Sequence, residues 1–413
     1  MALANPIHIA GILLISSATI TLSIFSACGF SESSETFPSP TSTLMPTTVT
    51  SSHRQAESPS TSQQFNVVIE VVAKELEVPW AVDFSQDGRI FITERTGSIR
   101  ILHDGVLQPE PYAKIDVVLR GEAGLMGLAV DPHFESNGFL YIYHTYLNNE
   151  GLLRNQVVRL LDHGTTGEIL ETILNEIPAD RIHNGGRIKF GPDKKLYITT
   201  GDADNAPLAQ NKASLAGKIL RINPDGSIPI DNPFPGSPVY SYGHRNPQGL
   251  AWHPVTEQLF ATEHGPVGHD ELNIIHPGAN YGWPIVSGAV SNPRFVDPLL
   301  ESGLETWAPA GAVIYSNGEL PSAWNNRLVF GSLRGNQLVW VMTRPPLYED
   351  VEEVGKSFAR KFGRLRDVAE GPDGYIYFTT SNMDGRGNPG VEDDLLLRIV
   401  PITGSLSAVP RIH

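Results

Sequence analysis

Residues 188–200 read IKFGPDKKLYITT, which is a short apolar strand, a turn built on Gly, Pro and Asp, and a second strand rich in aromatic and β-branched side chains. Gly, Pro and Asp are typical of tight turns, and β-branched and aromatic residues favour strands. The same strand–turn–strand unit recurs along the chain. The six copies lie at residues 80–93, 128–143, 188–200, 250–262, 312–330 and 367–379, and the fifth matches least well.

The length of the repeat indicates the architecture. Six copies over residues 65–400 give about 56 residues each, which suits a four-stranded antiparallel blade with some long loops. Radial packing buries both faces of each blade and leaves few open edges. No long stretch has the 3.6-residue periodicity of a helix. We therefore predict an all-β, six-bladed β-propeller over residues 65–403, with a C-terminal tail at 404–413; a two-sheet sandwich is the alternative.

The N-terminal region predicts export and a membrane anchor. Residues 1–27 contain no Lys, Arg, Asp or Glu, and an apolar run leads to Phe-Ser-Ala-Cys, which is similar to a bacterial lipobox. Cys28 is also the only cysteine in the sequence. We predict a lipoprotein-type signal peptide at 1–27, lipid attachment at Cys28 and a periplasmic or other extracytoplasmic protein held at a membrane. An uncleaved signal anchor is the alternative.

Residues 28–64 are rich in Ser, Thr and Pro and nearly lack aliphatic side chains, so we predict a flexible tether there. The formal net charge of the whole chain is −15 at pH 7. Nucleic-acid binding depends on Lys and Arg that neutralise phosphates. The charge balance therefore argues against a nucleic-acid partner.

Three of the repeats are preceded by segments that contain more polar residues than a tight turn requires. Glu122 stands in the Gly-rich segment 121–127, where glycine allows a ligand to approach the backbone closely. His183 begins the segment His-Asn-Gly-Gly-Arg and is a candidate general base, because histidine ordinarily titrates near neutral pH. Arg245 offers a rigid donor fork for carboxylates or developing oxyanions. Spacing alone leaves open a bulged strand at 121–127 and an incidental surface histidine.

Acidic residues follow the fourth repeat. Asp270 and Glu271 lie between segments rich in Gly, Pro and Asn. Carboxylates and backbone carbonyls are the ligands that Ca²⁺ favours, although the spacing here is not that of an EF-hand. The segment is therefore a candidate calcium site.

Arginines stand after the fifth repeat, at Arg334, and at the start of the sixth. Arg364 and Arg366 alternate on a predicted strand, so their side chains project to the same face. With Arg245 and Arg334 they predict a polyanionic small ligand in the central funnel. Surface salt bridges are the alternative interpretation.

Taken together and in this order, the segments resemble the glucose/sorbosone dehydrogenase family over roughly residues 68–400. The resemblance implies a six-bladed propeller that binds the cofactor PQQ in its funnel. It implies the oxidation of aldose sugars at the anomeric carbon to lactones, with electrons passed to an external acceptor, a quinone or a cytochrome. The three carboxylates of PQQ suit the arginine cluster.

The resemblance also implies roles for individual residues. His183 would be the general base, and Arg245 and Asn246 would lie beside the reactive quinone carbonyl. Further cofactor contacts would come from Glu122, His264, Asp270, Arg334, Arg364 and Arg366. The backbone carbonyls of Gly265 and Pro266 would hold Ca²⁺ against PQQ, and Glu271 with the backbone of Tyr281 would hold a second, structural Ca²⁺.

The chain also departs from the family pattern. Glu122 and His264 stand where the glucose dehydrogenases carry Gln, and a carboxylate near an anionic cofactor is repelled unless it is protonated or paired with a cation. The longer substrate loops of those enzymes have no clear counterpart, which favours an aldose dehydrogenase of broad specificity. Two alternatives remain: a non-catalytic ligand-binding propeller and a Ca²⁺-dependent lactonase, which needs side-chain carboxylates around a central metal.

Overall fold

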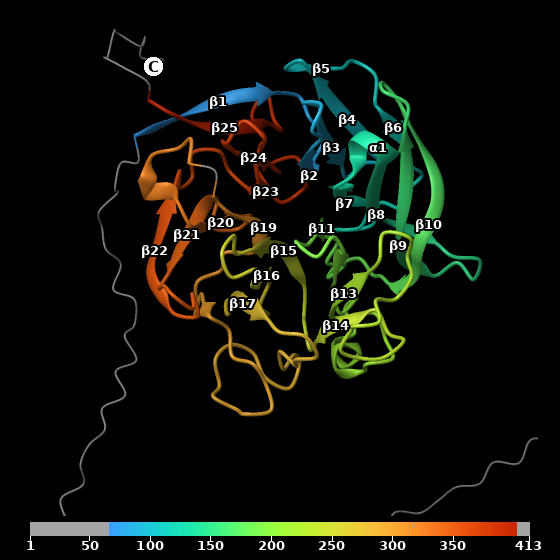
Figure 1. Cartoon of the computed structure of the whole chain (residues 1–413), viewed down its shortest axis with the longest axis vertical. Coiled ribbons are helices and arrows are strands. Elements are labelled where there is room, and N and C mark those ends of the chain that lie inside the picture. The colour runs from blue at the N-terminus through green and yellow to red at the C-terminus, as the bar shows by residue number, and fades with distance from the viewer. Residues whose placement is uncertain (1–65, 317, 403–413) are drawn as a thin grey trace, which may run out of the picture. The chain divides into compact units, whose positions relative to one another are not determined.

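The described part of the chain forms six antiparallel sheets around a common centre (Figure 1). The computed structural model describes residues 66–316 and 318–402. The predicted signal peptide, the lipid attachment at Cys28, the tether and the C-terminal tail lie outside these residues. Among the described residues no helix is long and apolar enough to cross a membrane. The predicted six-bladed propeller is confirmed.

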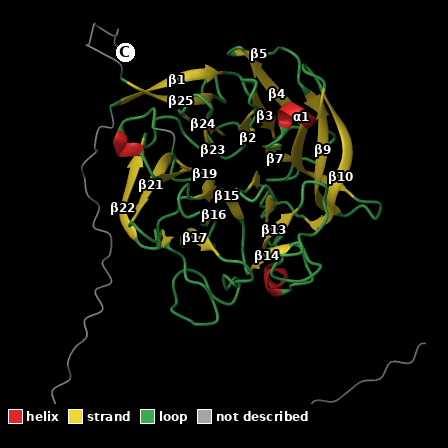
Figure 2. Cartoon of the chain, in the orientation of Figure 1, coloured by secondary structure: helices red, strands yellow, loops and turns green. Residues whose placement is uncertain are grey.

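Each blade runs outward from a strand at the centre, and strands and loops make up almost all of the described chain (Figure 2). The described residues contain three short helical segments, which are α1 (Phe134–Asn137) and the 3₁₀ turns Ala206–Gln210 and Ser322–Trp324. The strands, from the centre outward, are β2 (Pro79–Phe84), β3 (Ile90–Glu94), β4 (Ser98–His103), β5 (Val106–Leu107) and β6 (Ala113–Lys114) in blade 1; β7 (Leu125–Val130), β8 (Phe139–Leu147), β9 (Leu153–Asp162) and β10 (Gly167–Pro178) in blade 2; β11 (Ile188–Phe190), β12 (Leu196–Thr200), β13 (Lys218–Ile222) and β14 (Val239–Tyr242) in blade 3; β15 (Pro247–Trp252), β16 (Leu259–Glu263), β17 (Glu271–Ile275) and β18 (Leu300–Glu301) in blade 4; β19 (Pro309–Ile314), β20 (Arg327–Ser332), β21 (Gln337–Thr343) and β22 (Val351–Ser357) in blade 5; and β23 (Leu365–Glu370), β24 (Ile376–Thr380), β25 (Leu396–Pro401) and β1 (Val67–Ala73) in blade 6.

Blade 1 differs from the predicted four strands. Its outer edge is divided, because β5 and β6 pair with opposite ends of β4. Blade 6 is completed from the other end of the chain, where β1 pairs antiparallel with β25 and joins Val67 to Pro401. This pairing gives blade 6 its fourth strand and closes the ring, with β1 as the outermost strand of the last blade.

The recurring sequence unit forms the two inner strands of a blade, and its turn aspartate fixes the hairpin. In blade 3, Asp193 accepts hydrogen bonds from the Tyr197 hydroxyl at 3.0 Å and the Arg221 Nε at 2.9 Å. In blade 6, Asp373 is bound in the same way by the Tyr377 hydroxyl, at 2.8 Å. The aspartate therefore joins its turn to strands further along the blade, beyond what a tight turn requires.

Apolar side chains fill the space between neighbouring blades. Tyr141 of β8 and Phe190 of β11 meet edge to face across the interface of blades 2 and 3, with ring centroids 5.3 Å apart. Phe91 of β3 and Phe134 of α1 make a similar contact between blades 1 and 2, at 5.9 Å. Such pairs stabilise the interface beyond the burial of area alone.

A buried ion pair crosses the centre of the ring. The Arg187 Nη1 lies 2.9 Å from Asp367 Oδ2, and the same carboxylate oxygen accepts the Val82 N–H at 2.8 Å. The Arg187 Nε donates to the Gln248 carbonyl, and its guanidinium lies 4.5 Å from the Trp80 ring centroid. These contacts join blades 1, 3, 4 and 6, because Arg187 directly precedes β11.

We expect His144 of β8 to make the fold sensitive to acid. Burial lowers its pKa to about 4, while an unfolded histidine titrates near 6.5. Between these values the unfolded chain binds more protons, so the free energy of unfolding falls as the pH drops, by on the order of 1 kcal/mol per pH unit. The difference in melting temperature between pH 7 and pH 5 should shrink in His144→Gln. An unchanged difference would contradict the assignment.

Candidate active-site cavity

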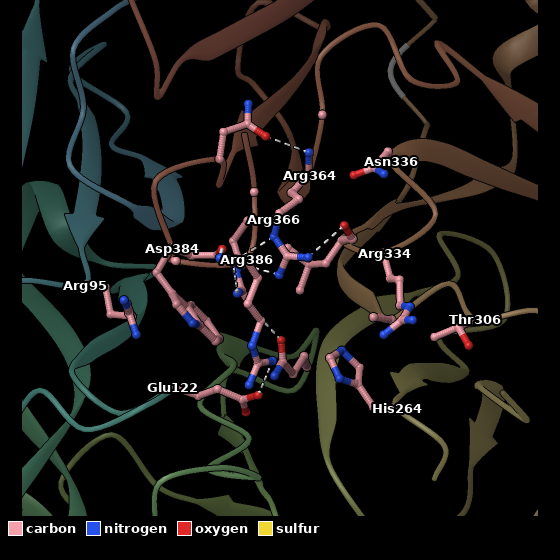
Figure 3. Close-up of a pocket in the computed structure, with 18 of the residues that line it drawn as sticks. Arg95, Glu122, His264, Thr306, Arg334, Asn336, Arg364, Arg366, Asp384 and Arg386 are labelled. Carbon is pink, nitrogen blue, oxygen red and sulfur yellow. Dashed lines mark hydrogen bonds and ion pairs between the residues drawn. The ribbon is translucent and has the colours of Figure 1, made fainter. Parts of the chain in front are cut away.

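A cavity of about 1130 Å³ opens at one end of the ring's centre (Figure 3). Its wall comes from the loops that precede the inner strand of a blade and the loops that follow the second strand. In an antiparallel hairpin these two positions lie at the same end, which is why segments far apart in sequence converge there. Every predicted cofactor residue and the predicted base lie in this wall or directly behind it.

His183 lines the cavity and is held by a buried carboxylate. Its Nδ1 lies 2.7 Å from the Asp202 Oδ1, and Asp202 Oδ2 accepts the Trp283 Nε1–H at 2.8 Å. Because Nδ1 is engaged, Nε2 is the ring nitrogen left for proton exchange in the cavity. Asp202 was not predicted from the sequence. It follows β12, whose end lies beside the start of β11.

The loop at His183 depends on a glycine. His183 has a left-handed backbone with φ of 57°, and a Cβ added at Gly201 would lie 1.9 Å from the His183 carbonyl oxygen. Any side chain at position 201 would therefore displace the histidine.

Arg245 and Asn246 lie on the adjacent wall. The Arg245 Nη1 donates to the Gly265 carbonyl at 2.7 Å and to the His264 carbonyl at 3.2 Å. The Asn246 Oδ1 accepts the Gly185 N–H at 2.9 Å, which connects this wall to the His183 loop.

Glu122 is paired with a cation, and this pairing would reduce the repulsion between its carboxylate and an anionic cofactor. Its Oε1 lies 2.8 Å from the Arg386 Nη1, and its Oε2 accepts the His183 N–H at 3.2 Å. Burial alone would raise the pKa of the Glu122 carboxyl, but His264, Arg386 and Arg366 lower it below its ordinary value. Burial lowers the pKa of His264 to about 3, so that ring is neutral at pH 7 and the two arginines supply the charge.

The predicted arginine cluster is assembled around one further acid. Arg364 binds Asp384 Oδ2 through Nε and Nη2, at 2.8 and 2.7 Å, and the Arg366 Nη2 lies 3.9 Å from the same oxygen. Arg366 is buried and its Nη1 donates to the Gln248 side chain at 2.7 Å. Burial lowers the pKa of Arg366 to about 10, so it remains charged at pH 7. Arg334 is exposed and lines the cavity beside Arg364, whose Nη1 donates to the Leu333 carbonyl at 3.1 Å (Figure 3).

The sequence did not identify all of the charged wall. Asp384 and Arg386 come from the loop after β24, Arg95 follows β3, and Arg360 and Lys361 precede β23. Eight cationic side chains line the cavity, against the four carboxylates of Glu122, Asp270, Asp384 and Asp393. In a chain with a net charge of −15, this is a local positive site suited to an anionic ligand.

Five buried side-chain nitrogens at the wall have no hydrogen-bond partner within the described residues. They are Nε of Arg95, Arg245 and Arg366, Nδ2 of Asn246 and Nε2 of His264. An unsatisfied buried donor costs free energy that a ligand oxygen can recover. The wall therefore suits a ligand with several carboxylate and carbonyl oxygens, such as PQQ.

The predicted calcium ligands fall in two places. Gly265 and Pro266 line the main cavity, where the Asp270 carboxylate is bound by the N–H groups of Gly265, Trp307 and Ala308. The Gly265 carbonyl already accepts a hydrogen bond from Arg245, so it is only partly available as a metal ligand. Calcium at this position would need oxygens from a bound cofactor.

Glu271 and Tyr281 line a second, much smaller cavity together with Glu263. Burial, with the neighbouring Glu263, raises the pKa of Glu271 to about 7. A cation would relieve the repulsion between these two buried carboxylates. Within residues 66–316 and 318–402, no group of three or more His, Cys, Asp and Glu side chains could by itself hold a metal ion.

Comparison with known proteins agrees with this geometry. A family model described as Glucose / Sorbosone dehydrogenase matches residues 76–398. Aldose sugar dehydrogenase YliI of Escherichia coli is 31% identical, over 77% of this chain and 91% of that protein. Quinoprotein glucose dehydrogenase B of Acinetobacter calcoaceticus is 28% identical, over 85% and 94% of the two chains. The PQQ-bound aldose sugar dehydrogenase of Streptomyces coelicolor has a TM-score of 0.72 at 36% identity, over 81% of this chain and 98% of that one.

Proposed function

Because the chain belongs to the glucose/sorbosone dehydrogenase family, we propose that it is a PQQ- and calcium-dependent aldose sugar dehydrogenase. One observation carries the proposal: a histidine fixed by a carboxylate shares a cavity with a cluster of arginines. The histidine supplies a base for a sugar hydroxyl, and the arginines supply partners for an anionic cofactor.

The residues of the wall divide into a cofactor end and a reaction end. Arg334, Arg364 and Arg366 would hold the carboxylates of PQQ, with the buried Nε of Arg366 as an unused donor. Arg245 and Asn246 would lie beside the quinone carbonyls. When bound, PQQ supplies an acceptor for the hydrogen that leaves the anomeric carbon together with its electron pair.

The chain's own part in the reaction is proton transfer. The Nε2 of His183 would take the proton of the anomeric hydroxyl, while Asp202 keeps Nδ1 engaged and stabilises the charge that forms on the ring. The aldose loses two electrons and two protons and becomes a lactone. An external acceptor would then take the electrons.

We assign calcium to both predicted positions within this proposal. The carbonyls of Gly265 and Pro266 with cofactor oxygens would form one site, and Glu271 with the Tyr281 backbone would form the other. The raised pKa of Glu271, caused by burial and by Glu263, supports a cation beside it. A cation against the quinone would act as a Lewis acid.

The proposal is tested by following dye reduction with a panel of aldoses after the purified protein has received PQQ and Ca²⁺. We expect activity only when both are present. Folded protein that does not bind PQQ would overturn the proposal and favour a ligand-binding propeller. Protein that binds PQQ but oxidises no aldose would overturn the assigned substrate class.

A further inference from the structure

The cavity has more positive charge than a cofactor with three carboxylates requires. Its eight cationic side chains still outnumber the carboxylates when those of PQQ are added to the four on the wall. Calcium would increase the excess. An excess of positive charge around a site raises the local concentration of anions and strengthens their binding.

Part of this excess lies between Asp384 and the proposed base, on the side of the cavity away from Arg334. Arg95 and Glu122 lie on one side of the cavity, and Arg334, Asn336 and Thr306 lie on the other (Figure 3). Glu122 is the carboxylate that binds Arg386, and its other oxygen accepts the His183 N–H. The charged group that includes Arg95, Glu122 and Arg386 is therefore adjacent to the proposed base.

Arg95 and Arg386 both line the cavity near Glu122, and only Arg386 forms an ion pair with this carboxylate. Arg95 donates to the Gly121 carbonyl, while its buried Nε has no hydrogen-bond partner within the described residues. The Arg386 side chain is 58% exposed and its ion pair with Glu122 faces solvent. Arg386 bonds Glu122 through Nη1, and its guanidinium carries further N–H donors that can bind a ligand anion while this ion pair is kept.

We propose that the preferred substrate is an aldose that carries an acidic group, a carboxylate or a phosphate, and that Arg95 and Arg386 bind this group beside His183. The inference rests on the proposed function and deepens it. The acidic group takes no part in the redox step. When bound, PQQ would supply the acceptor for the hydride of the anomeric carbon, and His183 would take the proton of its hydroxyl, so the product would be an acidic lactone.

The test compares matched sugars with the full chain loaded with PQQ and Ca²⁺. Glucuronic acid and galacturonic acid represent carboxylates, glucose 6-phosphate represents phosphates, and glucose and galactose are the neutral references. We expect kcat/KM to be about 10-fold or more higher for an acidic sugar than for its neutral counterpart, mainly through KM, and to fall as salt rises. The two acidic arms distinguish carboxylate from phosphate.

The arginines are tested by their effect on this preference. Arg95→Gln and Arg386→Gln should each lower the ratio of kcat/KM for acidic over neutral sugars by about 10-fold. Arg154→Gln is a matched control, because Arg154 pairs with Glu176 on blade 2 and does not line the cavity. Methyl glucuronide lacks a free anomeric hydroxyl, and we expect it to inhibit more strongly than methyl glucoside in the wild type and equally in the variants.

Each outcome separates this inference from the proposed function. Neutral aldoses oxidised as well as acidic ones, with no selective inhibition by methyl glucuronide, would overturn the inference and leave the enzyme standing. A ratio unchanged in both arginine variants would also overturn the roles of Arg95 and Arg386. If PQQ binds and no aldose of either kind is oxidised, the proposed function itself fails.

Discussion

Replacement of His183 by asparagine is expected to lower kcat by about 10²–10⁴-fold, the usual contribution of a positioned general base. Asparagine is a suitable replacement because it tolerates the left-handed backbone at this position, where φ is 57°. PQQ binding should be retained, since the imidazole faces the sugar in the proposed mechanism. The measurement is single-turnover reduction of bound PQQ by an aldose, alongside a binding titration.

Two further variants sharpen this experiment. Asp202→Asn should lower kcat less than the loss of the base, because His183 remains present but loses the carboxylate 2.7 Å from its Nδ1. His163→Asn is the control, since His163 lies in an exposed turn of blade 2 outside the cavity wall. Loss of PQQ binding by correctly folded His183→Asn would contradict its assignment as the base.

Arg366→Met should weaken PQQ binding by on the order of 10–100-fold, which corresponds to the loss of one or two charge-assisted hydrogen bonds. Arg366 is buried, so solvent and salt screen its charge poorly. Methionine keeps much of the side-chain volume and removes the donors. A calorimetric titration with PQQ gives the dissociation constant directly.

The fold must be monitored separately in this variant, because the Gln248 side chain loses its partner at 2.7 Å. Arg398→Met is a matched control in the same blade, where Arg398 pairs with Glu70 and Asp373 and does not reach the cavity. Equal PQQ affinity in the wild type and a correctly melting Arg366→Met would show that another group holds the cofactor.

The fold could be predicted from sequence because its repeating unit is local. Each inner hairpin, such as Ile188 to Thr200, contains its own turn residues and strand formers, so six blades follow from six copies. The closure of blade 6 by β1 could not be predicted this way. The pairing of Val67 with Pro401 joins the two ends of the described chain, and no local pattern specifies it.

The site was predicted incompletely: Asp270 and Arg334, which follow second strands, were identified, but two further aspartates were missed. His183, Arg245 and Arg364 precede inner strands in segments richer in polar residues than a turn needs, so they could be identified as candidates. Asp202 and Asp384 follow second strands, where an aspartate resembles an ordinary turn residue. These two aspartates were missed because the sequence pattern alone does not show that the end of a second strand lies beside the start of the first. In the structure the loops at both positions contribute to one wall.

The pairing of β1 with β25 also sets the order in which the molecule can be completed. A ribosome makes β1 first and β25 more than three hundred residues later, so blade 6 cannot form until almost the whole chain has been synthesised. Until then β1 has an unpaired edge, open to association with other chains. A truncation before Leu396 would leave that edge permanently exposed. We therefore expect folding chaperones to matter most for the period before the last strand emerges.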